Sequence, residues 1–129
     1  MVTIDASAFL AVILREPEAE AFAVRIAEAG GGVMSSVNLW EAVVRARTLH
    51  GDAGAEKVKA LVAKLNIHIA SATQEHCWTA ADAFARYGRR TPADLNLGDC
   101  FAYALAQEQG DGLLFKGDDF PKTDVKSAI

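Results

Sequence analysis

Short apolar runs alternate along this chain with amphipathic segments, and the two patterns predict different elements. Runs of β-favouring residues predict strands at 2–4, 33–34, 66–70 and 113–115. Apolar residues at helical spacing predict helices at about 8–13, 17–27, 37–50, 55–64, 73–87 and 96–106. Strands that alternate with helices favour an α/β fold, in which helices cover both faces of a small parallel sheet.

The length and composition narrow this expectation to one compact domain. The chain has 129 residues, of which 51% are hydrophobic and 23% charged. That balance is typical of a protein with a well-formed core, and the length leaves no room for a second domain. The first residues lack a basic leader, and no apolar run approaches the roughly 20 residues of a membrane span. We therefore expect an untargeted cytoplasmic protein with no membrane association.

The cysteines and the net charge exclude other classes. Cys77 and Cys100 lack a metal-binding or redox spacing and lie among apolar neighbours, so we expect two buried free thiols. The formal net charge is −4, which argues against a general nucleic-acid coat protein. It argues less against an enzyme with an acidic site, because a bound cation offsets the charge of its carboxylates.

Acidic residues stand where an α/β fold brings strand ends and helix starts to one edge of its sheet. They are Asp5, Glu41, Asp99, Asp118 and Asp119. Two carboxylates about 4 Å apart repel by about 4 kcal/mol at an effective dielectric constant near 20, so such a pocket needs a cation or raised pKa values. Oxygen ligands without His or Cys favour Mg²⁺ or Mn²⁺.

Each acidic residue also has a simpler interpretation. On a helical wheel Glu41 shares a stripe with Trp40 and Val44, which we expect to face the core, and it could instead pair with Arg45. Asp5 and Asp99 could only cap helices, and Asp118 with Asp119 could only form a turn. Ser7 would be a second cap or a hydrogen-bond partner for a ligand.

A small basic group could bind RNA beside such a pocket. It comprises Arg86, Arg89, Arg90 and Lys116, with Tyr87 available to stack on a base. The alternative is a solvated helix end and loop. The three histidines show no ligand spacing.

Four segments of this chain resemble PIN-domain proteins, specifically the VapC-type toxins of toxin–antitoxin pairs. They are Val-Thr-Ile-Asp5-Ala-Ser7, Asn-Leu-Trp-Glu41, Leu-Gly-Asp99-Cys-Phe-Ala-Tyr, and Leu-Leu-Phe-Lys116-Gly-Asp118-Asp119-Phe. They occur in the family's order and span nearly the whole chain. The last segment lacks the Thr-x-Asp/Asn that many members carry, so whether Asp118 or Asp119 takes the fourth acidic position stays open.

The resemblance implies a single PIN-like nuclease domain over residues 1–129, with a sheet of four to five strands. It implies a Mg²⁺-dependent endoribonuclease that cleaves structured RNA such as transfer RNA, with a carboxylate-bound metal activating the attacking water. Asp5 and Asp99 would hold the principal metal, and Glu41 with Asp118 or Asp119 would complete the site. It also implies a homodimer, a cognate VapB-type antitoxin whose peptide occupies the cleft, and higher toxin–antitoxin assemblies.

Two rival functions remain. A catalytically silent PIN-like binding module would keep the carboxylates for structure or partner contact. Another Mg²⁺-dependent phosphate enzyme, such as a phospho-acceptor receiver domain, needs an adjacent acid pair after its first strand and an acceptor Asp after its third. Here Asp5 stands alone and Ile69-Ala70-Ser71 offers no acid.

Overall fold

A computed structural model describes residues 1–129 and shows an α/β fold. Its strands are β1 (Val2–Ile4), β2 (Gly32–Ser35), β3 (Ile67–Ala70) and β4 (Leu113–Leu114). Its helices are α1 (Ala6–Ile13), α2 (Ala19–Glu28), α3 (Ser36–His50), α4 (Asp52–Lys64), α5 (Gln74–Tyr87), α6 (Leu97–Gln109) and the short 3-10 helix η1 (Phe120–Lys122). The predicted element order and type are confirmed, with ends that differ by a few residues.

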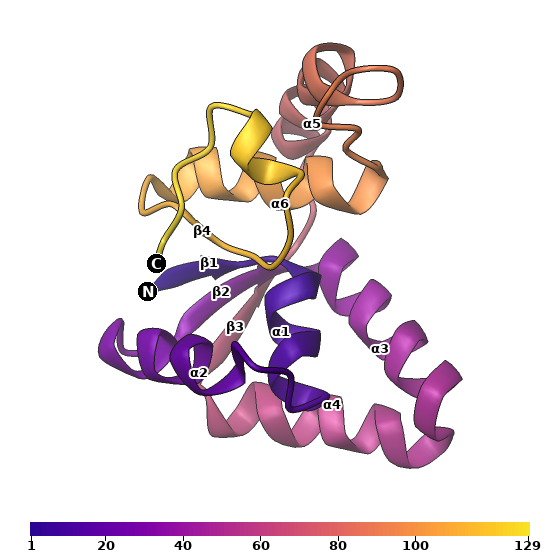
Figure 1. Cartoon of the computed structure of the whole chain (residues 1–129), viewed down its shortest axis with the longest axis vertical. Coiled ribbons are helices and arrows are strands. Elements are labelled where there is room, and N and C mark those ends of the chain that lie inside the picture. Colours follow the sequence, from indigo (N-terminus) through magenta and orange to yellow (C-terminus); the bar gives the residue numbers. More distant parts are fainter.

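The four strands form one parallel sheet in the order β3-β2-β1-β4. In Figure 1, α5 and α6 lie on one side of the sheet and α1 to α4 on the other. Four strands agree with the expected four to five, and beyond β4 there is only an isolated bridge between Leu113 and Ser127. The sheet thus has helices on both faces, as the alternation of elements predicts.

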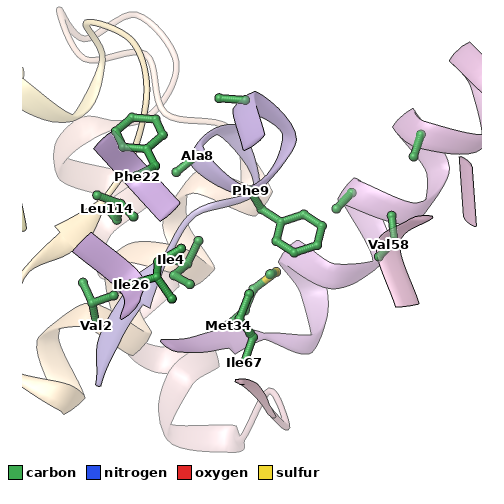
Figure 2. Packing of buried hydrophobic residues seen from close by; sticks show 13 residues of the cluster. Val2, Ile4, Ala8, Phe9, Phe22, Ile26, Met34, Val58, Ile67 and Leu114 are labelled. Carbon is green, nitrogen blue, oxygen red and sulfur yellow. The ribbon is translucent and has the colours of Figure 1, made fainter. Parts of the chain in front are cut away.

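Two apolar clusters fill the layers. One joins β1 and β2 to α1, α2 and α4, and Figure 2 shows Phe9 of α1 beside Met34 of β2 in it. The other lies under α5 and α6 and includes Leu95, Tyr103 and Phe120. Replacing a fully buried Phe such as Phe9 by Ala typically costs about 3–5 kcal/mol, so these clusters hold the sheet edge rigidly.

The predicted core-facing stripe of α3 is wrong. Trp40 is 66% exposed and Val44 is also exposed, whereas the buried face carries Ala42 and Ala46. The reason is a close approach between helices: a Cβ on Gly54 of α4 would lie 2.1 Å from the Ala46 carbonyl oxygen. Small side chains permit this contact, so the larger ones turn outward.

The cysteine prediction is half right. Both thiols are free, and Cys100 is buried, but Cys77 is exposed. Apolar neighbours in the sequence suggested burial, yet Cys77 lies in an open apolar groove between α5 and α6, where solvent reaches it. No helix of the structure is both long enough and apolar enough to cross a membrane.

Candidate functional site

The carboxyl end of β1 opens into a cleft where three helices begin. The cleft has a volume of about 310 Å³ and is lined by Asp5, Ala6, Ser7, Leu10, Glu41, Arg45, Asn96 and Asp99. Figure 1 shows the end of β1 and the starts of α1, α3 and α6 meeting at this edge of the sheet. Three of the predicted acidic residues therefore share one cleft, although they are up to 94 positions apart in the sequence.

Asp5 is fixed by its own helix start. It caps α1, and its Oδ2 accepts hydrogen bonds from the Ser7 backbone N–H at 3.0 Å and from Ser7 Oγ at 2.5 Å. Ser7 Oγ in turn accepts from the Lys116 backbone N–H at 3.0 Å, which ties the segment after β4 to α1. Asp5 is only 3% exposed, and its Oδ1 has no partner. The cap and the ligand interpretations are thus compatible, because capping uses one oxygen only.

Glu41 lies half-buried on the first half of α3, on the border of the buried face. Its Oε1 accepts a hydrogen bond from Asn38 Nδ2 at 2.8 Å. No ion pair joins it to Arg45, although Arg45 lines the same cleft. The alternative of a simple surface pair is therefore not supported.

Asp99 begins α6 within a reciprocal cap. Asn96 Oδ1 accepts from the Asp99 backbone N–H at 2.9 Å, and Asp99 Oδ2 accepts from the Asn96 backbone N–H at the same distance. This capping box fixes the carboxylate at the N-terminus of the helix. As with Asp5, the capping contact leaves the second oxygen for another partner.

Asp118 and Asp119 form the exposed turn before η1. The charge of Asp119 raises the pKa of Asp99, whereas Asp118 makes no such contribution. The two neighbours, which the sequence could not distinguish, therefore differ in their electrostatic relation to the cleft.

Burial and mutual repulsion raise the pKa values of the three clustered carboxyls. Desolvation raises the pKa of Asp5 to about 6, with Glu41 adding to the effect and the Ser7 hydrogen bonds opposing it. Desolvation also raises the pKa of Asp99 to about 6, helped by Asp5 and Asp119. The pKa of Glu41 is raised by desolvation and by Asp99. Such a cluster is a site where a cation would replace the missing solvation.

The donor set fits a hard divalent cation. The three acidic side chains supply only oxygen donors, and the buried Asp5 Oδ1 lacks any partner, while one cationic side chain, Arg45, lines the same cleft. No three His, Cys, Asp or Glu side chains lie close enough to hold one ion between them as they stand. The cluster therefore offers separate carboxylate ligands and not a ready-made three-ligand cage.

The predicted basic residues differ in their availability. Lys116 Nζ contacts Glu16 at 2.6 Å and Glu18 at 3.4 Å, so its charge is already compensated. Arg86 lies 4.7 Å from the centre of the Tyr87 ring and pairs with Asp124 at 3.6 Å.

Arg89 and Arg90 have no ion-pair partner and are exposed. They lie in the segment between α5 and α6, which ends at Asn96 in the cleft wall. Of the four predicted RNA contacts, these two are the ones whose charge no carboxylate compensates.

Two residues at the cleft were not singled out from the sequence. Asn38 is fully buried and donates from Nδ2 to Glu41 Oε1 and to the Gly98 carbonyl oxygen. At Gly98, an added Cβ would lie 2.1 Å from Glu41 Oε2. The available signal was the spacing of Asn38, three positions before Glu41 and so on the same side of the helix.

Comparison with known proteins places this arrangement in a family. A family model described as PIN domain matches residues 2–126. Ribonuclease VapC of Mycolicibacterium smegmatis is 34% identical over 123 residues, which cover 95% of each chain. Ribonuclease VapC36 of Mycobacterium tuberculosis is 36% identical over 125 residues, which cover 95% of this chain and 90% of the relative.

Solved structures share the fold at low identity. VapC20 of Mycobacterium tuberculosis, described as a sarcin-ricin loop cleaving toxin, has a TM-score of 0.76 and 15% identity, and the match covers 100% of this chain and 98% of that one. A toxin–antitoxin complex from Klebsiella pneumoniae has a TM-score of 0.70 and 16% identity, over 96% and 93% of the two chains. With the family model and the relatives above 30% identity, these matches show that the chain belongs to the PIN-domain family, among the VapC ribonucleases.

Proposed function

We propose that this protein is a metal-dependent endoribonuclease and the toxin of a type II toxin–antitoxin pair. The observation that carries the proposal is the convergence of Asp5, Glu41 and Asp99 from three elements on one cleft, with Asp5 Oδ1 unpartnered. Membership among the VapC ribonucleases supports the same activity. A carboxylate cluster of this kind supplies the protein ligands for Mg²⁺-assisted hydrolysis of a phosphodiester.

Each carboxylate would have a distinct part in that chemistry. Asp5 and Asp99 would hold Mg²⁺ or Mn²⁺, since each keeps one oxygen free of its helix cap. Glu41 and Asp119 would complete the site, with Asp118 as the alternative to Asp119. When bound, the cation would lower the pKa of water and offset charge developing on the phosphate. Ser7 would keep Asp5 in a single orientation.

Metal binding is testable without an RNA substrate. We expect Mn²⁺ titrated into the protein at pH 7.5 to raise the unfolding temperature, because the ion binds only the folded cluster. The Asp99→Asn variant should show a smaller rise, and the exposed Asp82→Asn variant on α5 should match wild type. An equal rise in all three proteins would place the ion elsewhere.

Structured RNA, with transfer RNA first, is the proposed substrate class. Arg89 and Arg90 would hold phosphates beside the cleft, and Arg86 with Tyr87 would supply a stacking surface. Incubating the protein with total transfer RNA and with a ribosomal sarcin-ricin stem–loop, then mapping the new 5′ ends, tests this choice. Discrete cuts in transfer RNA support it, and cuts confined to the ribosomal stem–loop would contradict it.

An antitoxin peptide is the proposed protein partner. A groove of about 730 Å³ between α1 and α4 has an apolar floor that includes Val12, Ile13 and Leu61. Arg15, Lys57 and Lys64 line the same groove and make no ion pairs. An acidic amphipathic segment of the antitoxin matches both features.

The groove can be tested with the product of the neighbouring reading frame. When this antitoxin candidate is co-expressed with the protein, it should co-purify with the wild type. It should not co-purify with the double variant Lys57→Glu/Lys64→Glu. Retention by the double variant would contradict this placement. The proposal also includes a homodimer, which the exposed Trp40, Trp78 and Leu97 support and light scattering would test.

A catalytically silent binding module is the rival function. It would bind its partner equally well with EDTA and would not cleave RNA with Mg²⁺. The raised pKa values of Asp5 and Asp99 favour the enzyme, because a module with no use for a cation gains nothing from buried, mutually repelling carboxyls.

A further inference from the structure

Asn38 is a buried polar residue with no role in the chemistry described so far. It lies on α3 with 0% of its surface exposed. Its Nδ2 donates to Glu41 Oε1 at 2.8 Å on the same helix and to the Gly98 carbonyl oxygen at 3.0 Å on α6. One amide group therefore links the carboxylate of one helix to the backbone of another.

The orientation of this amide follows from its neighbours. Both partners are oxygen acceptors, so only the NH₂ end can face them, and the carbonyl end must point away. Asn38 Oδ1 is accordingly buried without a partner. An unpaired buried acceptor is unfavourable for the folded state, and an apolar side chain would avoid it. Asn38 thus makes two hydrogen bonds through its NH₂ group while its carbonyl oxygen, left unpaired, lowers the stability of the folded state.

These hydrogen bonds act beside a close contact between Glu41 and Gly98. The Glu41 carboxylate lies against Gly98, the residue directly before Asp99, where a Cβ would overlap it. Asn38 draws together the same two segments, because it contacts Glu41 and Gly98 at once. Asn38 and Gly98 therefore set where the Glu41 carboxylate lies relative to the start of α6.

We propose that Asn38 is a positioning residue that holds the Glu41 carboxylate against the start of α6, so that Glu41 and Asp99 face the same cation. The inference rests on the proposed function, in which Glu41 helps to hold the metal. Residues that orient metal-binding carboxylates typically change metal affinity about 10- to 100-fold when they are replaced. Asn38 would act only through Glu41 and would touch neither the cation nor the RNA.

The test is a double-variant cycle read as Mn²⁺ affinity by titration calorimetry, at fixed pH and without RNA. The proteins are wild type, Asn38→Leu, Glu41→Gln and the double variant Asn38→Leu/Glu41→Gln. We expect Asn38→Leu to weaken Mn²⁺ binding about tenfold in the wild-type background and to have little further effect once Glu41 is Gln. An equal loss in both backgrounds would show a general structural effect and overturn the proposal.

Folding and metal binding are read separately. Asn38→Leu should stay folded with an unfolding temperature near that of wild type, because it removes an unpaired buried acceptor together with one donor to Glu41. Asn38→Ala is the second variant should Leu prove too large, and its Mn²⁺ affinity should fall by the same factor. Thr48→Ala, on an exposed position of the same helix, is the control and should bind Mn²⁺ as wild type does. Wild type that binds no Mn²⁺ would overturn the proposed function, whereas additive losses in a wild type that does bind would overturn the role of Asn38 alone.

Discussion

The Glu41 carboxylate packs directly on the backbone of Gly98, where a side chain as small as a methyl group would approach Glu41 Oε2 to 2.1 Å. Gly98 precedes Asp99 in the first turn of α6. The glycine therefore permits two acidic side chains from different helices to share one cleft. This relationship links a backbone position with no chemistry of its own to the geometry of the site.

Gly98→Ala should lower RNA cleavage about tenfold or more while the protein remains folded, because the added Cβ displaces Glu41. Alanine is the better helix former, so α6 itself should not be weakened. Cleavage rates and thermal unfolding are measured on the same preparations. Shortening the acid in Gly98→Ala/Glu41→Asp should restore part of the activity. Full activity in Gly98→Ala would contradict the role of this contact.

Asp5→Asn should stabilise the metal-free protein at pH 7.5, because it removes a buried charge while Asn remains a good helix cap. The pKa of Asp5 in the folded protein, about 6, exceeds the ordinary aspartate pKa of 3.8. The stability from the protonated form is thus fully present below about pH 4 and is lost as the pH rises through 6. The gain at pH 7.5 should be roughly 1–3 kcal/mol.

Urea unfolding in EDTA at pH 4 and pH 7.5 measures this difference. Wild type and Asp5→Asn should have nearly equal free energies of unfolding at the lower pH and should diverge at the higher one. The exposed Asp82→Asn variant is the control and should track wild type at both. A destabilised Asp5→Asn at pH 7.5 would show that the carboxylate is satisfied within the protein.

Asp118 and Asp119 form a matched pair in one exposed turn. Of the two, Asp119 alone raises the pKa of Asp99, so Asp119→Asn should reduce cleavage at saturating Mg²⁺ more than Asp118→Asn does. We expect about tenfold for the first and less than twofold for the second. Single-turnover rates on one RNA substrate measure both variants. The reverse order would assign the fourth acidic position to Asp118.

The basic residues should differ in their contribution to RNA binding, because only some of them are held in ion pairs. Arg89→Ala/Arg90→Ala should raise KM several-fold with little change in kcat and should lower the slope of log affinity against log salt by about 1–2. Lys116→Ala should change KM less, because ion pairs with Glu16 and Glu18 already compensate the charge of Lys116. Lys59→Ala, an exposed lysine of α4, is the control. A larger effect at Lys116 than at the arginines would contradict this order.

The sequence predicted the parts of the site that depend on local structure. Asp5 ends a strand and caps a helix, and Asp99 stands in a capping box, so their positions follow from neighbours within three residues. The face of α3 did not follow, because the close contact at Ala46 and Gly54 buries small residues and leaves Trp40 outside. A helical wheel weighs hydrophobicity and carries no information about which helix packs against which face.

Contacts between distant segments were also beyond the sequence. The pairing of Lys116 with Glu16 spans 100 positions, and the hydrogen bond from Asn38 to Gly98 spans 60. Both depend on the sheet order that brings β4 beside β1 and α6 beside α3. Local patterns thus identified the acidic residues of the site. The tertiary fold decided which basic and amide residues are available to contact them or the RNA.

The most direct measurement is cleavage of transfer RNA by the purified, antitoxin-free protein with Mg²⁺, with EDTA, and by Asp99→Asn with Mg²⁺. Discrete cuts are expected from the wild type with Mg²⁺ only. Cleavage by Asp99→Asn at the wild-type rate, or cleavage that persists in EDTA, would contradict a reaction carried by the carboxylate cluster.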